Sequence, residues 1–314
     1  MAELQTPAQP DFISRLETAV SRCQNPTVLG LDPKLEYLPA SLLQKTKADC
    51  ASPEEAVETA LFEFNRCLID AVKDIIPCVK PQLAYYELYG LPGLKALERT
   101  IRYARQQGLL VIADGKRNDI GSTSAAYAEA WLNQWDADAL TVNAYLGQDG
   151  IKPFIETAAA NGKGLFMLVR TSNPSAADLQ DLQLADGRRL YEAVADLLNL
   201  WSGDLPVAPS GYSLLGAVVG ATWPQQAQQL RLRLPRAYIL VPGYGAQGAT
   251  AEDCMASFDR QGRGALVNAS RSLMLAYRRD PAFAGRDEAV AEACRAEALR
   301  MRASLQAALA RHCG

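Results

Sequence analysis

The sequence predicts an α/β fold, a closed (β/α)8 barrel that forms one domain over residues 1–314 with an extra N-terminal helix. Three observations support this fold class. Short apolar runs alternate with amphipathic stretches, which is typical of βα units in a parallel sheet. Eight such runs fall within about 250 residues, which favours a closed barrel over an open doubly wound sheet. The composition, 49% hydrophobic and 21% charged, is ordinary for a globular chain with a large core.

The eight predicted strands are the apolar runs at 27–32, 78–82, 109–116, 139–145, 165–172, 214–222, 237–245 and 265–271. Amphipathic patterns between them predict helices, among others at 53–75, 93–107, 122–135, 191–201 and 224–232. The leading segment 11–23 predicts an extra helix that closes the lower end of the barrel. Segment 287–311 predicts the last outer helix. We interpret both as scaffold.

Two longer irregular stretches, 173–187 and 202–213, differ in their expected position. A loop that follows a barrel strand lies on the catalytic face, whereas a loop that precedes one lies on the opposite face. Stretch 173–187 follows the fifth predicted strand and is therefore a lid candidate. Stretch 202–213 precedes the sixth and is expected to have no part in the site.

Charge and composition narrow the class of protein. The net charge of −3 gives no electrostatic reason to expect nucleic acid or an anionic membrane as partner. No apolar run approaches the roughly 20 residues that a membrane span requires, and residues 1–10 have no basic segment followed by an apolar stretch, so we expect a cytoplasmic protein. The seven cysteines are scattered, which argues against disulfides and zinc ligands. The only histidine, His312, lies near the end, so proton transfer is expected to use Lys, Asp, Glu or Tyr.

The most informative motif places charges of alternating sign at the end of the third apolar run. Along a strand, Asp114 and Lys116 point to one side while Gly115 faces the other. Burying an ion costs several kcal/mol unless it is paired, so a reaction centre is a better explanation than stability. Lys80, on the second predicted strand, is expected to meet Asp114 and to extend a Lys-Asp-Lys-Asp array that ends at Asp119. The alternative is a salt-bridged structural cluster, and Asp119 could instead cap the following helix or reach across an oligomer interface.

A phosphate site is predicted after the seventh and eighth strands. Gly243, Gly245 and Gly248 let the backbone approach an anion, Gln247 offers an amide donor, and Arg271 offers a bidentate fork. Barrels of this kind commonly bind phosphate at that position. The alternative is that the glycines only form a turn.

These motifs together resemble the orotidine 5'-phosphate decarboxylase family. Segment 114–123 is similar to the family's signature, and the other similar blocks follow in the family's order, at 30–32, 80–82, 242–248 and 268–272. The resemblance spans about residues 12 to 280. The chain is most similar to a longer bacterial subgroup, with an insertion at 40–53.

The resemblance implies a lyase that needs no cofactor or metal and converts orotidine 5'-phosphate into UMP and carbon dioxide, the last step of de novo UMP synthesis. Lys116 would donate the proton to C6, and Asp114 would lie against the substrate carboxylate. Lys80 and Asp119 would complete the charge network and contact the ribose. In the family the aspartate matching Asp119 reaches the neighbouring subunit's site, which implies a homodimer with shared active sites.

The resemblance also implies a set of substrate-binding residues. Asp32 would bind the ribose hydroxyls and Thr123 would contact the nucleotide. Ser172 would read the pyrimidine, with Thr171 as the neighbouring alternative. The phosphate would be held by Gln247 and Arg271, with Pro242 on the same loop.

Two other functions compete with this interpretation. A metal-dependent sugar-phosphate lyase or aldolase could use Asp32 and Asp114, but a divalent ion needs several oxygen ligands and Lys80 and Lys116 would repel it. A non-catalytic phosphate-binding protein could keep the same barrel. Such a protein would be expected to have lost part of the charge array, which is present in full.

Overall fold

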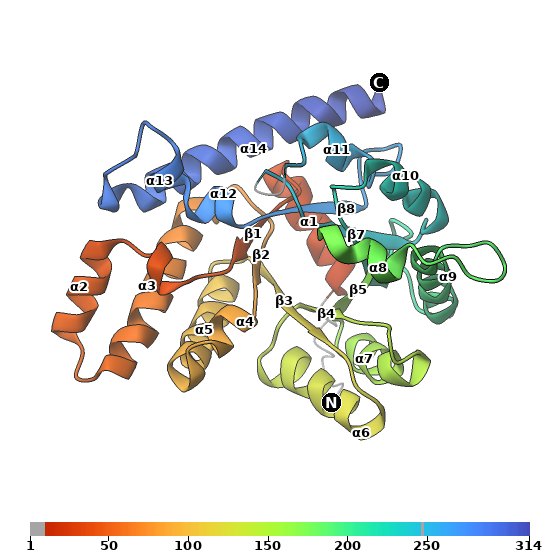
Figure 1. Ribbon diagram of the computed structural model, residues 1–314, viewed down its shortest axis with the longest axis horizontal. Coiled ribbons are helices and arrows are strands. Elements are labelled where there is room, and N and C mark those ends of the chain that lie inside the picture. Colours follow the sequence, from red (N-terminus) through yellow and green to blue (C-terminus); the bar gives the residue numbers. More distant parts are fainter. Residues whose placement is uncertain (1–9, 246–247) are drawn as a thin grey trace, which may run out of the picture.

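The computed structural model describes residues 10–245 and 248–314. Its eight parallel strands pair in sequence order and the last pairs with the first, so the predicted (β/α)8 barrel is confirmed (Figure 1). All eight predicted strands are present, and all but the third end earlier than predicted. They are β1 Thr27–Leu31, β2 Cys78–Pro81, β3 Leu110–Arg117, β4 Ala139–Val142, β5 Gly164–Arg170, β6 Ser213–Val219, β7 Ala237–Val241 and β8 Ala265–Ala269.

The helices surround the barrel, and every helix predicted above is present. The stretch predicted as one helix at 122–135 is α-helical only in its first part and continues as a π-helical turn, Glu129–Gln134. The helices are α1 Phe12–Cys23, α2 Ala40–Asp49, α3 Pro53–Val72, α4 Ala84–Glu87, α5 Gly90–Gln106, α6 Gly121–Ala128, α7 Gln148–Ala160, α8 Ala177–Gln180, α9 Leu190–Ser202, α10 Pro224–Arg233, α11 Ala251–Met255, α12 Arg271–Met274, α13 Ala276–Arg279 and α14 Val290–Cys313. No helix within the described ranges is long and apolar enough to cross a membrane.

Helix α1 closes the lower end of the barrel, as predicted. Asp11 caps the helix by accepting a hydrogen bond from the Ser14 amide. Phe12 is buried and meets the Phe166 ring edge-on at 6.1 Å, where Gly164 leaves the room that a Cβ would fill. The 202–213 stretch adds Ala208 and Tyr212 to this same lower cluster, so it lies away from the catalytic face as expected.

The 40–53 insertion lies outside the barrel. It forms α2 and the turn that begins α3, where the Ser52 side chain accepts a hydrogen bond from the Glu55 amide and Pro53 takes the first helical position. Figure 1 shows α2 at the edge of the molecule, packed beside α3. The insertion therefore extends the outer layer of helices.

Candidate active site

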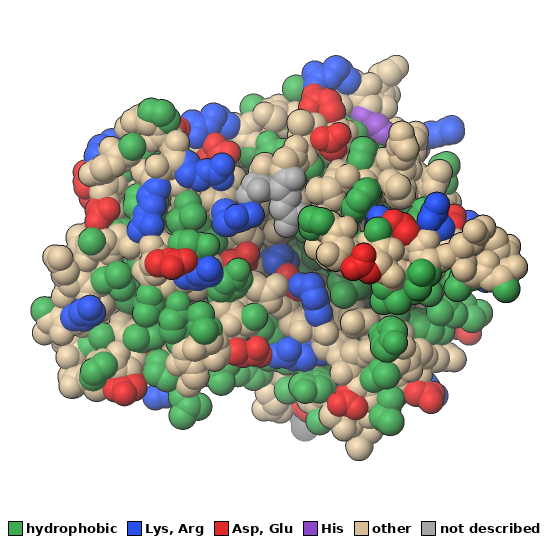
Figure 2. Space-filling view, viewed as in Figure 1, with side chains coloured by type: hydrophobic (Ala, Val, Ile, Leu, Met, Phe, Trp, Pro, Cys, Tyr) green, Lys and Arg blue, Asp and Glu red, His purple; other side chains and the backbone are tan. Residues whose placement is uncertain are grey.

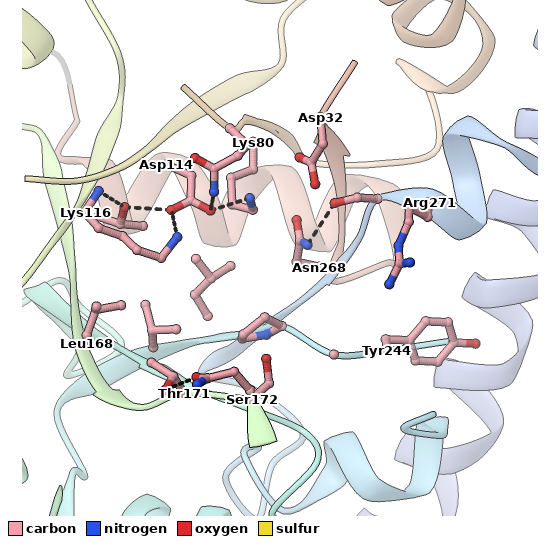
Figure 3. Close-up of a pocket in the computed structure, with 18 residues that line it drawn as sticks. Asp32, Lys80, Asp114, Lys116, Leu168, Thr171, Ser172, Tyr244, Asn268 and Arg271 are labelled. Carbon is pink, nitrogen blue, oxygen red and sulfur yellow. Dashed lines mark hydrogen bonds and ion pairs between the residues drawn. The ribbon is translucent and has the colours of Figure 1, made fainter. Parts of the chain in front are cut away.

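A cavity of about 410 Å³ opens at the carboxyl ends of the strands. Its lining gathers side chains from strands that are far apart in the sequence, which is how a barrel builds a site. Figure 3 shows the charged array at one end of this cavity and Arg271 at the other. The predicted site residues that line it are Asp32, Lys80, Asp114, Lys116, Ser172, Pro242 and Arg271, together with the alternative Thr171.

Asp114 lies between two ammonium groups. The Lys80 Nζ is 2.6 Å from Asp114 Oδ2, and the Lys116 Nζ is 2.6 Å from Asp114 Oδ1 (Figure 3). Asp114 and Lys80 are buried, at 7% and 4% exposure, because β2 and β3 are neighbours in the barrel wall. The Lys116 side chain keeps 43% exposure. Lys116 is therefore the member of the array that is most open to solvent.

The backbone of β3 is irregular at this point, and the regular alternation expected through Lys116 is wrong in detail. The pairing of β3 with β4 shifts register between Ala113 and Arg117, and Lys116 has a φ of 47°. A non-glycine residue in the left-handed region carries strain that commonly marks functional sites. Asp114 and Lys116 are in direct contact, as predicted, but through this irregular backbone and not through regular alternation along a strand.

Two residues that sequence reasoning missed hold this arrangement. The Thr141 hydroxyl donates to Asp114 Oδ1 at 2.9 Å and accepts from the Lys116 amide at 2.9 Å. The Gln82 amide donates to Asp114 Oδ2 at 3.1 Å. Both had a weak signal in the sequence, since each is a polar side chain within or directly after an apolar run. Asp114 thus accepts four hydrogen bonds that fix its orientation.

The electrostatics of the array keep it charged. Burial disfavours the ionised form of Asp114, but Lys80 and Lys116 outweigh it and hold the pKa of that carboxyl well below its ordinary value. Burial also works against the charge on Lys80, but Asp114 and Asp32 outweigh it and raise the pKa of that ammonium. Both groups are therefore ionised around neutral pH.

Replacing Asp114 with asparagine is expected to destabilise the fold by about 3–5 kcal/mol near pH 7, because the buried Lys80 charge would lose its main partner. The pKa of Asp114 is lower in the folded chain than in the unfolded chain. Its stabilising effect is therefore present above the ordinary aspartate pKa and is lost as the pH falls below about 4. Urea unfolding of both proteins across the acid range measures this effect. A stability difference that does not shrink at low pH would contradict it.

Asp32 directly follows β1, the strand beside β2, and one of its oxygens has no hydrogen-bond partner within the described residues. Burial raises the pKa of Asp32, although Lys80 and the Ser270 hydroxyl favour its charged form. Within the described residues, the buried Oδ1 atoms of Asp32 and Asn268 have no hydrogen-bond partner. Buried acceptors are normally satisfied, so these two oxygens indicate a place for donors from a ligand.

Ser172 and Thr171 both line the cavity, but their hydroxyls are differently placed. The Thr171 hydroxyl donates to Asn173 Oδ1 and accepts from the Gln180 amide, each at 2.7 Å. Among the described residues, the Ser172 hydroxyl has no such partner, and Figure 3 shows it at the edge of the cavity. The geometry therefore favours Ser172 over Thr171 as the residue that hydrogen-bonds the ring of a bound ligand.

The predicted phosphate end is only partly described. Gly243, Gly245 and Gly248 have φ values of 110°, 69° and 93°, so the turn needs glycine at each position. Gln247 lies outside the described residues. Arg271 starts α12 directly after β8 and lines the cavity. The phosphate role of this end stays a prediction.

Within residues 10–245 and 248–314, no group of three or more His, Cys, Asp or Glu side chains is placed to hold a metal ion. Both carboxylate oxygens of Asp114 face ammonium groups instead.

The comparisons with known proteins agree with this geometry. The family model described as "Orotidine 5'-phosphate decarboxylase / HUMPS family" matches residues 45–287. The chain belongs to this family. An orotidine 5'-phosphate decarboxylase from Rhodopirellula baltica is 42% identical over 94% of this chain and 99% of its own length. Another, from Caldicellulosiruptor saccharolyticus, is 40% identical over 85% of this chain and 90% of its own. The solved OMP decarboxylase of Leishmania donovani is 30% identical, with a TM-score of 0.68 over 93% of this chain and 98% of that one.

The decarboxylase-family signature continues past β3 to two residues that lie outside the cavity of this chain. Asp119 is half-buried and its Oδ1 accepts a hydrogen bond from the neighbouring Ile120 amide at 2.8 Å. The alternative of a helix cap is wrong, because the N-cap of α6 is Ile120 and has no side-chain cap. Thr123 is exposed on the first turn of α6. A single chain thus brings together three of the four predicted charges.

Proposed function

We propose that this chain decarboxylates orotidine 5'-phosphate to UMP and carbon dioxide, without a metal or cofactor, and that the Lys80–Asp114–Lys116 array is its reaction centre. The observation that carries the proposal is the buried Asp114 carboxylate held between two ammonium groups at one end of the cavity. Relatives named orotidine 5'-phosphate decarboxylase are 40% to 42% identical over most of the chain. This enzyme is a carboxy-lyase of pyrimidine biosynthesis.

The chemistry of the array follows from its charges. Loss of carbon dioxide breaks the bond between C6 and the carboxylate carbon and leaves the electron pair on C6. No ring position delocalises that pair, so a fixed ammonium beside it stabilises charge that develops only in the transition state. Lys116 supplies this field and then transfers its Nζ proton to C6. Asp114 lies against the substrate carboxylate, so their repulsion is relieved as carbon dioxide leaves.

The remaining cavity residues are proposed to bind the rest of the nucleotide. The ribose hydroxyls would satisfy the buried Oδ1 of Asp32, which otherwise has no partner in the described chain. Ser172 would hydrogen-bond the pyrimidine. At the far end, Pro242, Gln247 and Arg271 would hold the phosphate, whose binding energy favours closure of the site.

We propose further that the enzyme is a homodimer in which Asp119 and Thr123 complete the partner's site. Large apolar side chains are exposed on the loops and helices that follow β2, β3 and β4, and these segments are adjacent because their strands are adjacent. Figure 2 shows hydrophobic side chains gathered over α4 and α5 beside the central hollow. Exposed apolar surface of this kind marks interaction sites. The exposed side chains are Leu88, Leu91, Ile120, Tyr127, Tyr145 and Leu146.

Two further proposals concern organisation and location. The chain is proposed to act as one domain, since its strands close a single barrel and α14 packs back on it, with Arg295 bonding Ala71 and Asp74 at the end of α3. It is proposed to work in the cytoplasm. All seven cysteines are free thiols, as expected for a reducing compartment.

The test of the proposed activity is an ultraviolet absorbance assay with orotidine 5'-phosphate and purified protein, before and after EDTA treatment. We expect the substrate to disappear, UMP to form in equal amount, and EDTA to have no effect. Activity that EDTA abolishes would favour the metal-dependent lyase or aldolase. Protein that binds UMP and leaves the substrate unchanged would favour a non-catalytic binding protein.

A further inference from the structure

Arg170, the last residue of β5, is fully buried, and it fastens the segment that follows the strand. Its Nη1 donates to Gln180 Oε1 at 3.3 Å and its Nη2 donates to Asp181 Oδ2 at 3.1 Å. The guanidinium also lies 4.4 Å from the centre of the Trp223 ring and 5.5 Å from that of Tyr191. Arginine is rarely buried to this extent unless it is paired and stacked. The segment after β5 is thus anchored at α8.

Gln180, the last residue of α8, turns its side chain back to the end of β5. Its Oε1 accepts a hydrogen bond from the Thr171 amide at 2.9 Å, and its Nε2 donates to the Thr171 hydroxyl at 2.7 Å. With the bond from Arg170, the side-chain amide makes three hydrogen bonds. Both of its ends are therefore fixed, and so is the peptide that leads into Ser172.

The other side of Ser172 is held by the residues that follow β6. The Trp223 indole donates to the Thr171 carbonyl at 3.1 Å, and the Thr222 hydroxyl donates to the Ser172 carbonyl at 3.2 Å. Gly220 allows this approach, since a Cβ there would lie 2.8 Å from the Ser172 Cα. The amide and carbonyl of Thr171 and the carbonyl of Ser172 are thus all hydrogen-bonded, and the Ser172 side chain lines the cavity.

We propose that Gln180, oriented by Arg170, is a positioning residue that fixes the Thr171–Ser172 backbone so that the Ser172 hydroxyl meets the pyrimidine. This inference rests on the proposed function and concerns the same site. It assigns Gln180, in the middle of the 173–187 stretch, a role in specificity, in addition to the lid role predicted for that stretch. A displacement of about 1 Å in a substrate-positioning group can cost about 100-fold in rate.

The test measures binding of two probes, UMP and ribose 5-phosphate, to wild type and Gln180→Leu by titration calorimetry. We expect UMP affinity to fall by about tenfold or more, while ribose 5-phosphate, which lacks the pyrimidine, binds within about twofold of wild type. Gln183→Leu is the matched control, because Gln183 is exposed in the same segment and bonds only within its loop. Equal weakening of both probes, or unchanged UMP binding, would overturn the inference.

A double-mutant cycle shows whether Gln180 acts through Ser172. In a Ser172→Ala background, Gln180→Leu is expected to have little further effect on kcat/KM, since the hydroxyl that it positions is gone. If Gln180→Leu lowers kcat/KM by the same factor in the Ser172→Ala background as in wild type, the inference is overturned. If Gln180→Leu does not fold, Arg170→Lys, which keeps the charge but loses the planar fork, is expected to give the same pattern more weakly. Failure of the wild-type protein to bind UMP would contradict the proposed function itself. If wild type and Gln180→Leu bind UMP equally well, only the positioning role is contradicted.

Discussion

Replacing Lys116 with alanine is expected to lower kcat for orotidine 5'-phosphate by about 10⁴-fold or more. The variant loses both the proton donor and the cation that faces the developing charge on C6. Asp114 keeps its bond to Lys80 at 2.6 Å, so the fold is expected to persist. The measurement is the decrease in substrate absorbance at saturating concentration, together with circular dichroism to confirm folding.

Lys152→Ala is the matched control for this variant. Lys152 is exposed on α7 and pairs only weakly with Glu156, at 3.8 Å, away from the cavity. Its replacement should leave the rate unchanged. A folded Lys116→Ala protein that retains its rate within about tenfold would show that Lys116 neither carries the proton nor stabilises the carbanion.

Mixing inactive Asp119→Ala and Lys116→Ala chains is expected to restore about a quarter of wild-type activity. In a mixed dimer, one site receives an intact Lys116 from its own chain and an intact Asp119 from the partner, while the other site carries both defects. Random assembly makes about half of the dimers mixed, and each has one working site. The measurement is activity after the two variants are unfolded together and refolded.

The mixing experiment needs two controls. Wild type taken through the same unfolding and refolding must recover its activity, and each variant refolded alone must remain inactive. Mixtures that stay inactive under these conditions would place Asp119 in the site of its own chain or in no site.

The sequence predicts the barrel well because its signal is local. Each strand is an apolar run with a loop and a helical pattern after it, so the order of elements can be deduced without knowing their pairing. The sequence predicts the ends of the strands less accurately. The seventh strand stops at Val241, where Pro242 and Gly243 leave the sheet, although the apolar pattern allowed it to extend to residue 245.

The site is predictable where neighbouring strands meet. Lys80 and Asp114 come from β2 and β3, which are adjacent in any barrel with this strand order, so their contact follows from topology. The left-handed backbone of Lys116 and the support from Thr141 depend on how β3 shifts against β4. The bond between Gln180 and Thr171 depends on how the following loop folds back. Neither feature has a local sequence pattern, so only the structure shows them.

A crystal structure of the protein with UMP bound tests the central claim most directly. We predict that C6 of the pyrimidine lies beside the Lys116 Nζ, that the ribose hydroxyls bond Asp32, and that the phosphate contacts Arg271. The partner's Asp119 is expected at the same site. UMP bound with its pyrimidine away from Lys116, or bound outside this cavity, would contradict the account.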